Sequence, residues 1–209
     1  MKHLDKAAKT TGPSPGKSQR ILDAAIAVIA EHGYANSRVA AIADRAGVAD
    51  GTVYLYFKNK DELLMAALDS AFHRFIARAK KAIQELPTPE EKLRRIAFLH
   101  LESLGSNRNL AIVLQTELRH SAKFLGEFSN KLLVEYFDLI KDVLRQGQET
   151  GAFRQGIHVT VAAHCFFGAL DEIVTTWILS DRQRDKDFHI SSLADAMVDI
   201  LMKGVAAGS

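Results

Sequence analysis

The sequence predicts an all-α protein of about nine helices, with short helices near the N-terminus and longer ones after them. Apolar residues recur three and four positions apart along most of the chain, as they do on one face of an α-helix, and no stretch alternates as a strand does. No proline follows Pro89, so nothing in the second half of the chain interrupts long helices. Gly47 lies between two short apolar clusters, as the turn between two crossing helices requires.

Three helices are expected within a first domain over residues 17–77, behind a tail at residues 1–16 whose Lys, Gly, Pro and Ser content predicts disorder. The apolar stripe of the first helix ends at Gly33, because glycine readily adopts the backbone conformation that terminates helices. The second and third helices are short and are centred on Ile42 and on Val53. A long fourth helix leads out of this domain.

A second helical domain is expected over residues 78–209. The fourth helix and the helices of this domain show as apolar stripes over residues 64–79, 93–104, 110–114, 125–143, 159–179 and 193–201. The stretch 159–179 is apolar nearly all round, which is typical of a buried helix. Together with the last stripe it is too apolar for the surface of a monomer, so a homodimer through the last two helices is expected.

Composition narrows the class of protein. A hydrophobic content of 47% supports a packed core, and the single cysteine, Cys165, excludes an internal disulfide. No apolar run is judged long enough to cross a bilayer, and the N-terminus lacks an apolar signal core, so a cytoplasmic protein that does not enter the membrane is expected. Residues 1–60 hold nine Lys/Arg against five Asp/Glu, an excess that suggests a nucleic-acid face but also arises by chance.

Residues 37–60 carry the most specific pattern. Gly47 supplies the positive φ angle that a tight turn between two helices needs. Ser37 is expected to N-cap the helix before the turn, and Asn59 with Glu62 resembles a capping box for the long helix after it. This arrangement of two short helices is typical of units that place the second helix in a DNA major groove.

The polar residues of this segment are those that a DNA reader exposes. Arg38 and Lys60 are cations at helix starts, where they and the backbone N–H groups can hold phosphates. Thr52, Tyr54 and Tyr56 project hydroxyls from a short helix that fits a major groove. Double-stranded DNA is therefore the expected partner.

This segment resembles the DNA-binding domain of the TetR family of bacterial repressors. The resemblance covers about residues 17–77 and rests on Ile42-Ala43, Ala46-Gly47-Val48, Gly51-Thr52-Val53-Tyr54-Leu55-Tyr56-Phe57 and Lys60. It implies base contacts from Asp50, Gly51 and Tyr54 and phosphate contacts from Thr52, Tyr56 and Lys60. The whole set expected on a palindromic operator is Ser37, Arg38, Asp50, Gly51, Thr52, Tyr54, Leu55, Tyr56 and Lys60. Ala49 stands where the family often has a capping serine, so Asp50 is expected to cap instead.

Two segments of the second domain, residues 109–121 and 168–181, are similar to FadR-type members of that family. Those members repress fatty-acid degradation genes and release DNA on binding long-chain acyl-CoA, so the resemblance implies this effector and no cofactor. The chain has no convincing nucleophile elbow, metal motif, phosphate loop or dinucleotide fingerprint, so an enzyme is not expected. A repressor that answers another hydrophobic molecule, such as a drug or a signal, and controls efflux or other genes stays open.

An acyl chain needs a long apolar tunnel between helices. The side chains expected to line it are Phe98, Leu101, Leu104, Leu114, Phe128, Tyr136, Ile140, Phe167 and Trp177. Arg119 and His120 are expected to hold the phosphates of coenzyme A near its mouth. Both sets have a plainer explanation, because such apolar residues more often form a core and such cations more often lie on a solvated face.

Four polar residues interrupt the apolar stretch. Asp171 and Glu172 would be costly to bury unpaired, so they are expected to pair with one of the two cations just named or to lie at a polar subunit seam. His164 and Cys165 lack a second pair of ligands at a suitable spacing, so no metal is expected and His164 is interpreted as a core histidine with satisfied hydrogen bonds.

Overall fold

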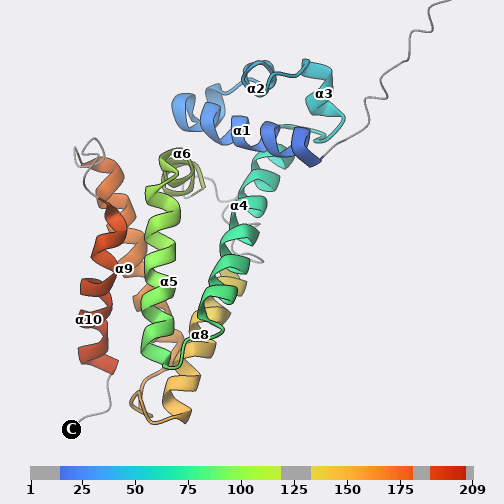
Figure 1. Ribbon diagram of the computed structural model, residues 1–209. Helices are drawn as coiled ribbons and strands as arrows, with labels where there is room; N and C mark the ends of the chain where they lie inside the picture. Colours follow the sequence, from blue (N-terminus) through green and yellow to red (C-terminus); the bar gives the residue numbers. More distant parts are fainter. Residues whose placement is uncertain (1–14, 119–132, 181–188, 206–209) are drawn as a thin grey trace, which may run out of the picture.

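The computed structural model describes residues 15–118, 133–180 and 189–205 of the chain. Within these ranges it contains nine α-helices, one π-helical segment and one 3-10 segment, and it has no strand there. The predicted all-α class is therefore confirmed. Figure 1 shows a small head lying across one end of a bundle of longer helices; the head consists of α1 (Pro15–Asn36), α2 (Val39–Ala46) and α3 (Asp50–Tyr54).

Two glycines with positive φ angles set the helix ends in the head, as predicted. Gly33, with a φ angle of 75°, leaves the helical conformation near the end of α1, and Gly47, with 66°, caps α2. The backbone N–H groups of Gly47 and Val48 donate to the carbonyls of Asp44 and Ala43, both at 3.0 Å. These bonds close the turn and hold α3 at a fixed angle to α2.

The long helix α4 (Lys60–Ile83) belongs to two hydrophobic cores. Its first half packs on the head, where the shared core includes Ile21, Ile29, Ile42, Val53, Leu64 and Leu68. Its second half packs in the bundle through Ile76, Ala79 and Ile83. A movement of α4 within the bundle must therefore move the head as well.

The bundle, which we call the body, is centred on α5 (Pro89–Gly105). Its other helices in the described ranges are α6 (Arg108–Ile112), α8 (Val134–Glu149), α9 (Val159–Leu179) and α10 (Ala194–Val205), with the π-helical segment Val113–Leu118 and the 3-10 segment Ile190–Leu193. The side chains of Leu93, Ile96 and Leu101 on α5 have no exposed surface. α5 contacts α4, α8, α9 and α10, so it is the helix around which the body packs.

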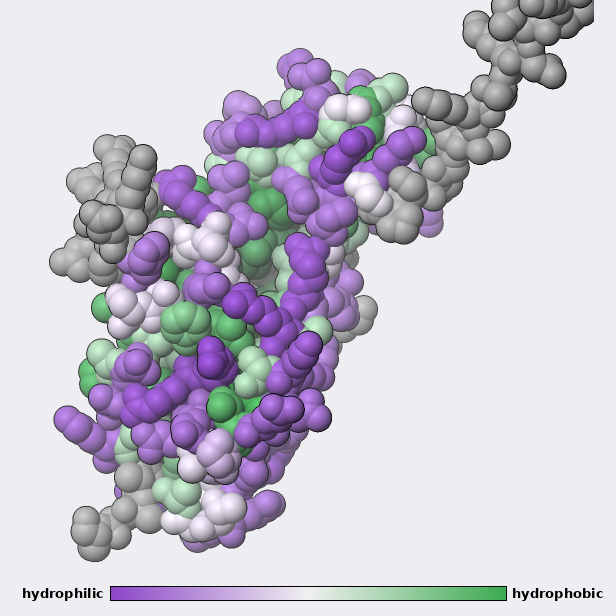
Figure 2. Space-filling model, in the orientation of Figure 1, coloured by the Kyte–Doolittle hydropathy of each residue, from purple (hydrophilic) through white to green (hydrophobic). Residues whose placement is uncertain are grey.

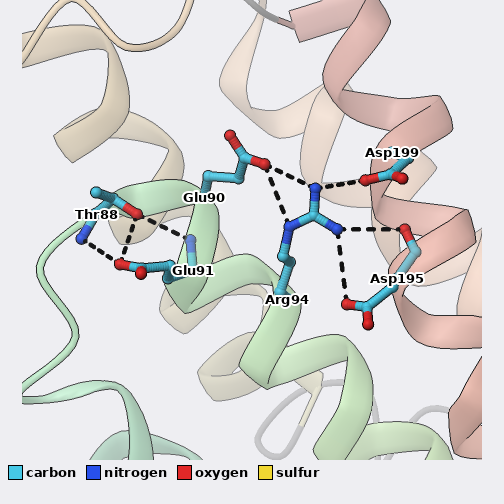
Figure 3. A network of polar contacts seen from close by, with 6 residues as sticks. All are labelled: Thr88, Glu90, Glu91, Arg94, Asp195 and Asp199. Atoms are coloured by element: carbon cyan, nitrogen blue, oxygen red, sulfur yellow. Dashed lines mark hydrogen bonds and ion pairs between the residues drawn. The ribbon is translucent and has the colours of Figure 1, made fainter.

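Polar contacts fix both the start of α5 and its packing on α10 (Figure 3). The Thr88 hydroxyl accepts from the Glu91 N–H at 3.2 Å, and the Glu91 carboxylate accepts from the Thr88 N–H at 3.1 Å, which is a complete capping box. One turn later the Arg94 guanidinium lies 2.7 Å from Glu90 and also pairs with Asp195 and Asp199 of α10. The carboxylates of Glu90 and Asp199 raise the pKa of Arg94 above its usual value.

The described elements differ from the predicted ones at residues 110–114 and at the start of α1. The stripe over residues 110–114 forms no single helix, because α6 ends at Ile112 and a π-helical segment continues from Val113. Of the helix expected over residues 125–143, the described part begins with α8 at Val134 and continues to Glu149, and the earlier residues lie outside the described ranges. The expected tail at residues 1–16 also lies outside them, except that α1 already begins at Pro15.

The helix α9 is less buried than its composition predicts. Val161 is 58% exposed and Leu179 80% exposed, and Ile200 on α10 is 75% exposed. Figure 2 shows hydrophobic side chains at the surface of the body, among the more hydrophilic ones. In the part of the chain that the structure describes, α9 is also the one helix that is long and apolar enough to cross a membrane, which corrects the expectation that no run reaches that length. Core helices of soluble proteins pass the same test, and α9 packs on α5 and α8.

Candidate nucleic-acid interface and effector site

The short helix α3 separates its side chains into a buried and an exposed set. Val53 is 1% exposed and is inserted between α2 and the start of α4, so it fixes the position of the helix. Tyr54 and Leu55, in contrast, are 56% and 67% exposed. Asp50 and Gly51 are exposed as well, and Thr52 and Tyr56 are half-buried at the edges. A tyrosine hydroxyl and an apolar side chain on one exposed helical surface can contact base edges and thymine methyl groups.

Ser37 does not cap α2, which contradicts its expected capping role. The N-cap residue of α2 is Arg38, and no side chain caps that helix. The Ser37 hydroxyl instead donates to the carbonyl of Gly33 at 2.7 Å, and Ser37 is 3% exposed. The reason is that Ser37 directly follows the last turn of α1, where both its backbone N–H and its hydroxyl reach the carbonyl of Gly33.

Asp50 does not cap α3 either. The N-cap residue of α3 is Ala49, without a side-chain hydrogen bond, and Asp50 is the first residue of the helix. The carboxylate of Asp50 is thus exposed in the first helical turn, where a negative charge is favourable. Arg38, at the start of α2, is likewise exposed.

The Lys60 side chain makes hydrogen bonds within the protein, whereas the sequence predicted that it would contact a DNA phosphate. Its ammonium donates to the carbonyls of Tyr34 at 2.7 Å and of Ser37 at 2.9 Å, and it lies 4.3 Å from the centre of the Tyr34 ring. The Tyr34 hydroxyl in turn donates to the Asp61 carboxylate. Burial and this carboxylate together raise the pKa of Tyr34. Lys60 therefore joins the start of α4 to the end of α1.

The predicted cap of α4 is present in a slightly shifted form. The Asn59 side chain accepts from the Glu62 N–H at 2.8 Å, as expected. The Glu62 carboxylate reaches back to the N–H of Lys58, also at 2.8 Å, rather than to that of Asn59. The two bonds satisfy backbone donors at the point where α4 leaves the head.

The side chains expected to line an acyl tunnel form a closed core. Leu101, Tyr136 and Ile140 are fully buried, and Leu104 and Trp177 are 9% and 8% exposed. Phe167 is partly buried against the body core, and Leu114 lies between the two cores. Phe98 is 39% exposed, which corrects its expected place inside the tunnel. The remaining expected residues, Arg119, His120 and Phe128, lie outside the described ranges.

A cavity of about 190 Å³ lies elsewhere, between the head and the body. It is lined by residues of α1 and α4 and of the segment at α6, among them Leu22, Ile26, Ala67, Arg74 and Asn107. Its volume is below that of usual ligand pockets, which range from roughly 300 to 1,000 Å³. This cavity is therefore too small for a long acyl chain.

His100 is a buried polar residue that the sequence analysis did not single out. It lies on the apolar stripe of α5 and is 7% exposed. Its Nδ1 atom is 3.0 Å from the Tyr136 hydroxyl, and its Nε2 atom has no hydrogen-bond partner in the described structure. Burial lowers the pKa of His100 to about 4 and raises that of Tyr136, so both side chains are neutral at pH 7. The signal in the sequence was a histidine at a position where the stripe requires an apolar side chain.

The acidic residues of α9 have hydrogen-bond partners within the described ranges. Asp171 accepts a hydrogen bond from the Gln115 side chain at 2.6 Å, and Gln115 accepts one from the Thr175 hydroxyl at 3.1 Å. Gln115 is buried in the π-helical segment, so this group joins that segment to α9. Glu172 is exposed and accepts from Thr176. The two cations expected to pair with these carboxylates lie outside the described ranges.

His164 is not a core residue. It is exposed on α9, where its Nδ1 atom is 2.7 Å from the carbonyl of Thr160 and its ring stacks on Phe137 with 4.4 Å between the centres. Cys165 is exposed beside it. This surface of α9 faces away from the body core, which explains why a pattern of burial did not predict it.

Comparison with known proteins covers both parts of the chain. Residues 21–67 match the family model described as bacterial regulatory proteins, tetR family, and residues 68–204 match the one described as YsiA-like protein, C-terminal region. The fatty acid metabolism regulator protein of Bacillus subtilis (strain 168) is 39% identical over 189 residues, which are 90% of this chain and 95% of that protein.

Two solved structures are similar over nearly the same range. The fatty acid degradation regulator FadR from Bacillus halodurans is 38% identical, with a TM-score of 0.81, over 88% of this chain and 97% of that chain. The transcriptional regulator FadR from Bacillus subtilis, in complex with stearoyl-CoA, is 39% identical with the same TM-score and coverage. These relatives are regulators and not enzymes. The chain belongs to the TetR family of bacterial regulatory proteins, and it is a transcriptional regulator with a helix-turn-helix head.

Proposed function

We propose that the protein is a homodimeric repressor of fatty-acid metabolism genes that leaves its operator when long-chain acyl-CoA binds to its body. The observation that carries this proposal is the 39% identity to a fatty acid metabolism regulator over 90% of the chain. It is supported by the similar fold of a FadR that was solved in complex with stearoyl-CoA. Because it acts on DNA, we place the protein in the cytoplasm, without a membrane role for α9.

The head supplies the DNA contacts in this proposal. The exposed side chains of α3 and of the turn before it read bases, and Arg38 at the start of α2 holds a phosphate. Lys60 and Ser37 contribute by holding α1 and α4 in place, and Lys60 can reach a phosphate through its backbone N–H at the start of α4. A palindromic operator requires two heads about one DNA turn apart, roughly 34–36 Å.

The second head comes from a second copy of the chain, bound through α9 and α10. These helices expose Val161, Leu179 and Ile200, and a four-helix seam would cover such side chains. Gly168, exposed near the middle of α9, permits a close approach of a partner helix. Arg94 pairs with Asp199 and so holds α10 on α5, which keeps α10 in one surface with α9.

Release follows from the position of α4 in both cores. An acyl chain that enters the body must displace the rings of Phe72 and Phe75 on α4, which pack against Tyr136. The first half of α4 carries the head, so a shift of α4 changes the distance or tilt of the two heads. The effector then binds better to a form that does not fit successive major grooves.

An operator-binding titration tests the proposal. A labelled operator, selected from random DNA by the full-length protein, is followed by fluorescence anisotropy while palmitoyl-CoA is added. We expect release at micromolar palmitoyl-CoA and none with coenzyme A or palmitate alone. If no acyl-CoA releases the protein, the family assignment stands and the ligand is another hydrophobic molecule.

A further inference from the structure

The His100–Tyr136 pair lies inside a cluster of aromatic rings contributed by four helices. Phe75 of α4 and Phe167 of α9 stand edge-on to the His100 ring, each with 6.1 Å between the ring centres. Tyr136 of α8 stacks on it at 5.7 Å. His100 itself comes from α5, so the imidazole lies where α4, α5, α8 and α9 meet. The predicted acyl-binding region has the same centre.

The hydrogen-bond pattern indicates which group of the imidazole lacks a partner. If the Tyr136 hydroxyl donates to Nδ1 of His100, the only group left unsatisfied in the pair is the N–H at Nε2. In the opposite arrangement both the tyrosine proton and the Nε2 lone pair lack partners. The first arrangement leaves fewer buried polar groups unsatisfied, so His100 presents one N–H donor to an apolar surrounding.

This donor lowers the stability of the unliganded protein, because a buried polar group without a partner has lost its hydrogen bonds to water and gained none in return. An apolar side chain at position 100 would continue the stripe of α5 without that cost. The donor becomes favourable only if something that enters the body accepts its hydrogen bond. The acceptor must be a single oxygen atom on an otherwise apolar molecule, because the surrounding side chains are aromatic rings.

We propose that the Nε2–H of His100 donates a hydrogen bond to the thioester carbonyl oxygen of the bound acyl-CoA. The inference rests on the proposed function and deepens it. Going from the hydrocarbon end towards the head group, the thioester carbonyl is the first hydrogen-bond acceptor of an acyl-CoA. It is therefore the oxygen that reaches an apolar core together with the chain. His100 positions the thioester, and Tyr136 holds the imidazole in the donating tautomer.

A pair of ligands that differ at this carbonyl tests the proposal. Palmitoyl-CoA is compared with S-hexadecyl-CoA, a thioether of equal chain length that has a methylene group in place of the carbonyl. Binding to the full-length protein is measured by isothermal titration calorimetry, with operator release as the second readout. We expect the wild type to bind palmitoyl-CoA about tenfold more tightly than the thioether.

Variants of His100 separate the hydrogen bond from other differences between the two ligands. His100→Leu should bind both ligands with nearly equal affinity, and His100→Gln, which keeps an N–H donor, should retain most of the preference. His73→Leu, which removes an exposed histidine from α4, is the matched control and should keep the full preference. Circular dichroism establishes whether each variant is folded. If His100→Leu does not fold, the comparison of the two ligands in the wild type still tests the proposal.

Three outcomes would overturn the proposal. Equal affinity of the wild type for the two ligands would mean that Nε2–H faces a water molecule. A preference that persists in His100→Leu would place the thioester elsewhere. In both cases acyl-CoA still binds and the proposed function stands, whereas failure of the wild type to bind palmitoyl-CoA removes the proposed function together with the inference.

Discussion

The ammonium group of Lys60, the first residue of α4, donates to the carbonyl of Tyr34 at 2.7 Å and lies 4.3 Å from the centre of the Tyr34 ring. Tyr34 belongs to the last turns of α1, whose carbonyls have no further helical donors beyond Asn36. The Lys60 ammonium thus binds a carbonyl at the end of α1 and fixes the start of α4 beside it. The angle between the head and α4 depends on this contact, and the same angle sets the position of α3.

Replacement of Lys60 should lower the free energy of unfolding and should leave the salt dependence of DNA binding nearly unchanged. Lys60→Met keeps most of the side-chain volume and removes the charged donor, so we expect a loss of roughly 1–3 kcal/mol in the free energy of unfolding. Urea unfolding at one fixed protein concentration measures it. Lys58→Met, at an exposed lysine two residues earlier, is the control and should change stability little. A Lys60→Met protein of wild-type stability whose DNA affinity depends less on salt would instead support a phosphate contact through the ammonium.

Arg38 and Tyr54 should affect DNA binding in different ways. Arg38→Ala removes an exposed cation, so it should weaken binding to all DNA and reduce the slope of log K against log salt by about one. Tyr54→Ala removes an exposed side chain of α3 and should change which base is preferred, by about 1–3 kcal/mol at one position. Anisotropy titrations on the operator and its single-base variants, at several salt concentrations, separate the two effects. A change of base preference in Arg38→Ala would reverse the assigned roles.

The exposed apolar side chain of Ile200 should be needed for dimer formation. Ile200→Glu places a carboxylate in the proposed seam, where it would be buried without a partner, so we expect monomers at micromolar concentration. Sedimentation velocity measures the change. Leu55→Glu is a matched control at an exposed apolar residue of the head, and it should stay dimeric while losing DNA affinity. A dimer that survives in Ile200→Glu would place the seam on another surface.

The elements of the head were predictable because their causes are local. A glycine between two short apolar clusters determines the turn at Gly47, and Asn59 with Glu62 is enough to indicate where α4 begins. The residue roles that the sequence analysis missed depend on contacts that the helix pattern does not specify. Lys60 bonds to Tyr34 across 26 residues, and Ser37 reaches the carbonyl of Gly33 four residues earlier. No spacing rule shows which side chains reach the last carbonyls of a helix.

The body shows the same limit in its core. Apolar spacing correctly placed Leu101, Tyr136 and Ile140 inside, but spacing alone does not distinguish a core from a tunnel that opens for a ligand. His100 and Tyr136 are 36 residues apart, so their contact depends on how α5 packs on α8. The same holds for Gln115 and Asp171, whose 56-residue separation hides their hydrogen bond. A polar residue on an apolar stripe is the signal that the sequence does provide.

Buried His100 should make the protein less stable in mild acid. Its pKa is about 4 in the folded protein, against the ordinary value of 6.5, so the unfolded chain binds a proton more readily between these values. The contribution of neutral His100 to the free energy of unfolding is complete above pH 6.5. It falls by roughly 3 kcal/mol as the pH decreases to 4. The unfolding free energy of the wild type should therefore fall by that amount relative to that of His100→Leu between pH 7 and pH 4. The other histidines titrate in both proteins, so a constant difference would mean that His100 does not cause the effect.

Acyl-CoA affinity should rise steeply with chain length and then stop rising. Each methylene group transferred from water to the body contributes about 0.8 kcal/mol, which is roughly a fifteenfold gain in affinity for every two carbons. The core is closed around Leu101, Tyr136 and Ile140, so a chain must first separate side chains that pack well, and short chains do not offset that cost. Calorimetric titration of the full-length protein with acyl-CoAs from octanoyl to eicosanoyl tests this, with coenzyme A as the control. Equal affinity across the series would mean that the chain stays outside the body.

The same series tests whether acyl-CoA and operator are linked through α4. If the acyl chain acts by moving α4, acyl-CoA lowers operator affinity by a coupling factor that is typically 5- to 150-fold. Thermodynamic linkage then requires that saturating operator lowers acyl-CoA affinity by the same factor. Calorimetry with and without operator gives one factor, and anisotropy with and without acyl-CoA gives the other. A loss of operator affinity that keeps growing as acyl-CoA is raised, without reaching a plateau, would show that acyl-CoA competes for the head itself, because direct competition has no finite coupling factor. Acyl chains too short to open the core should give a coupling factor near one in both measurements. They leave unchanged the packing of the rings of Phe72 and Phe75, which both belong to α4.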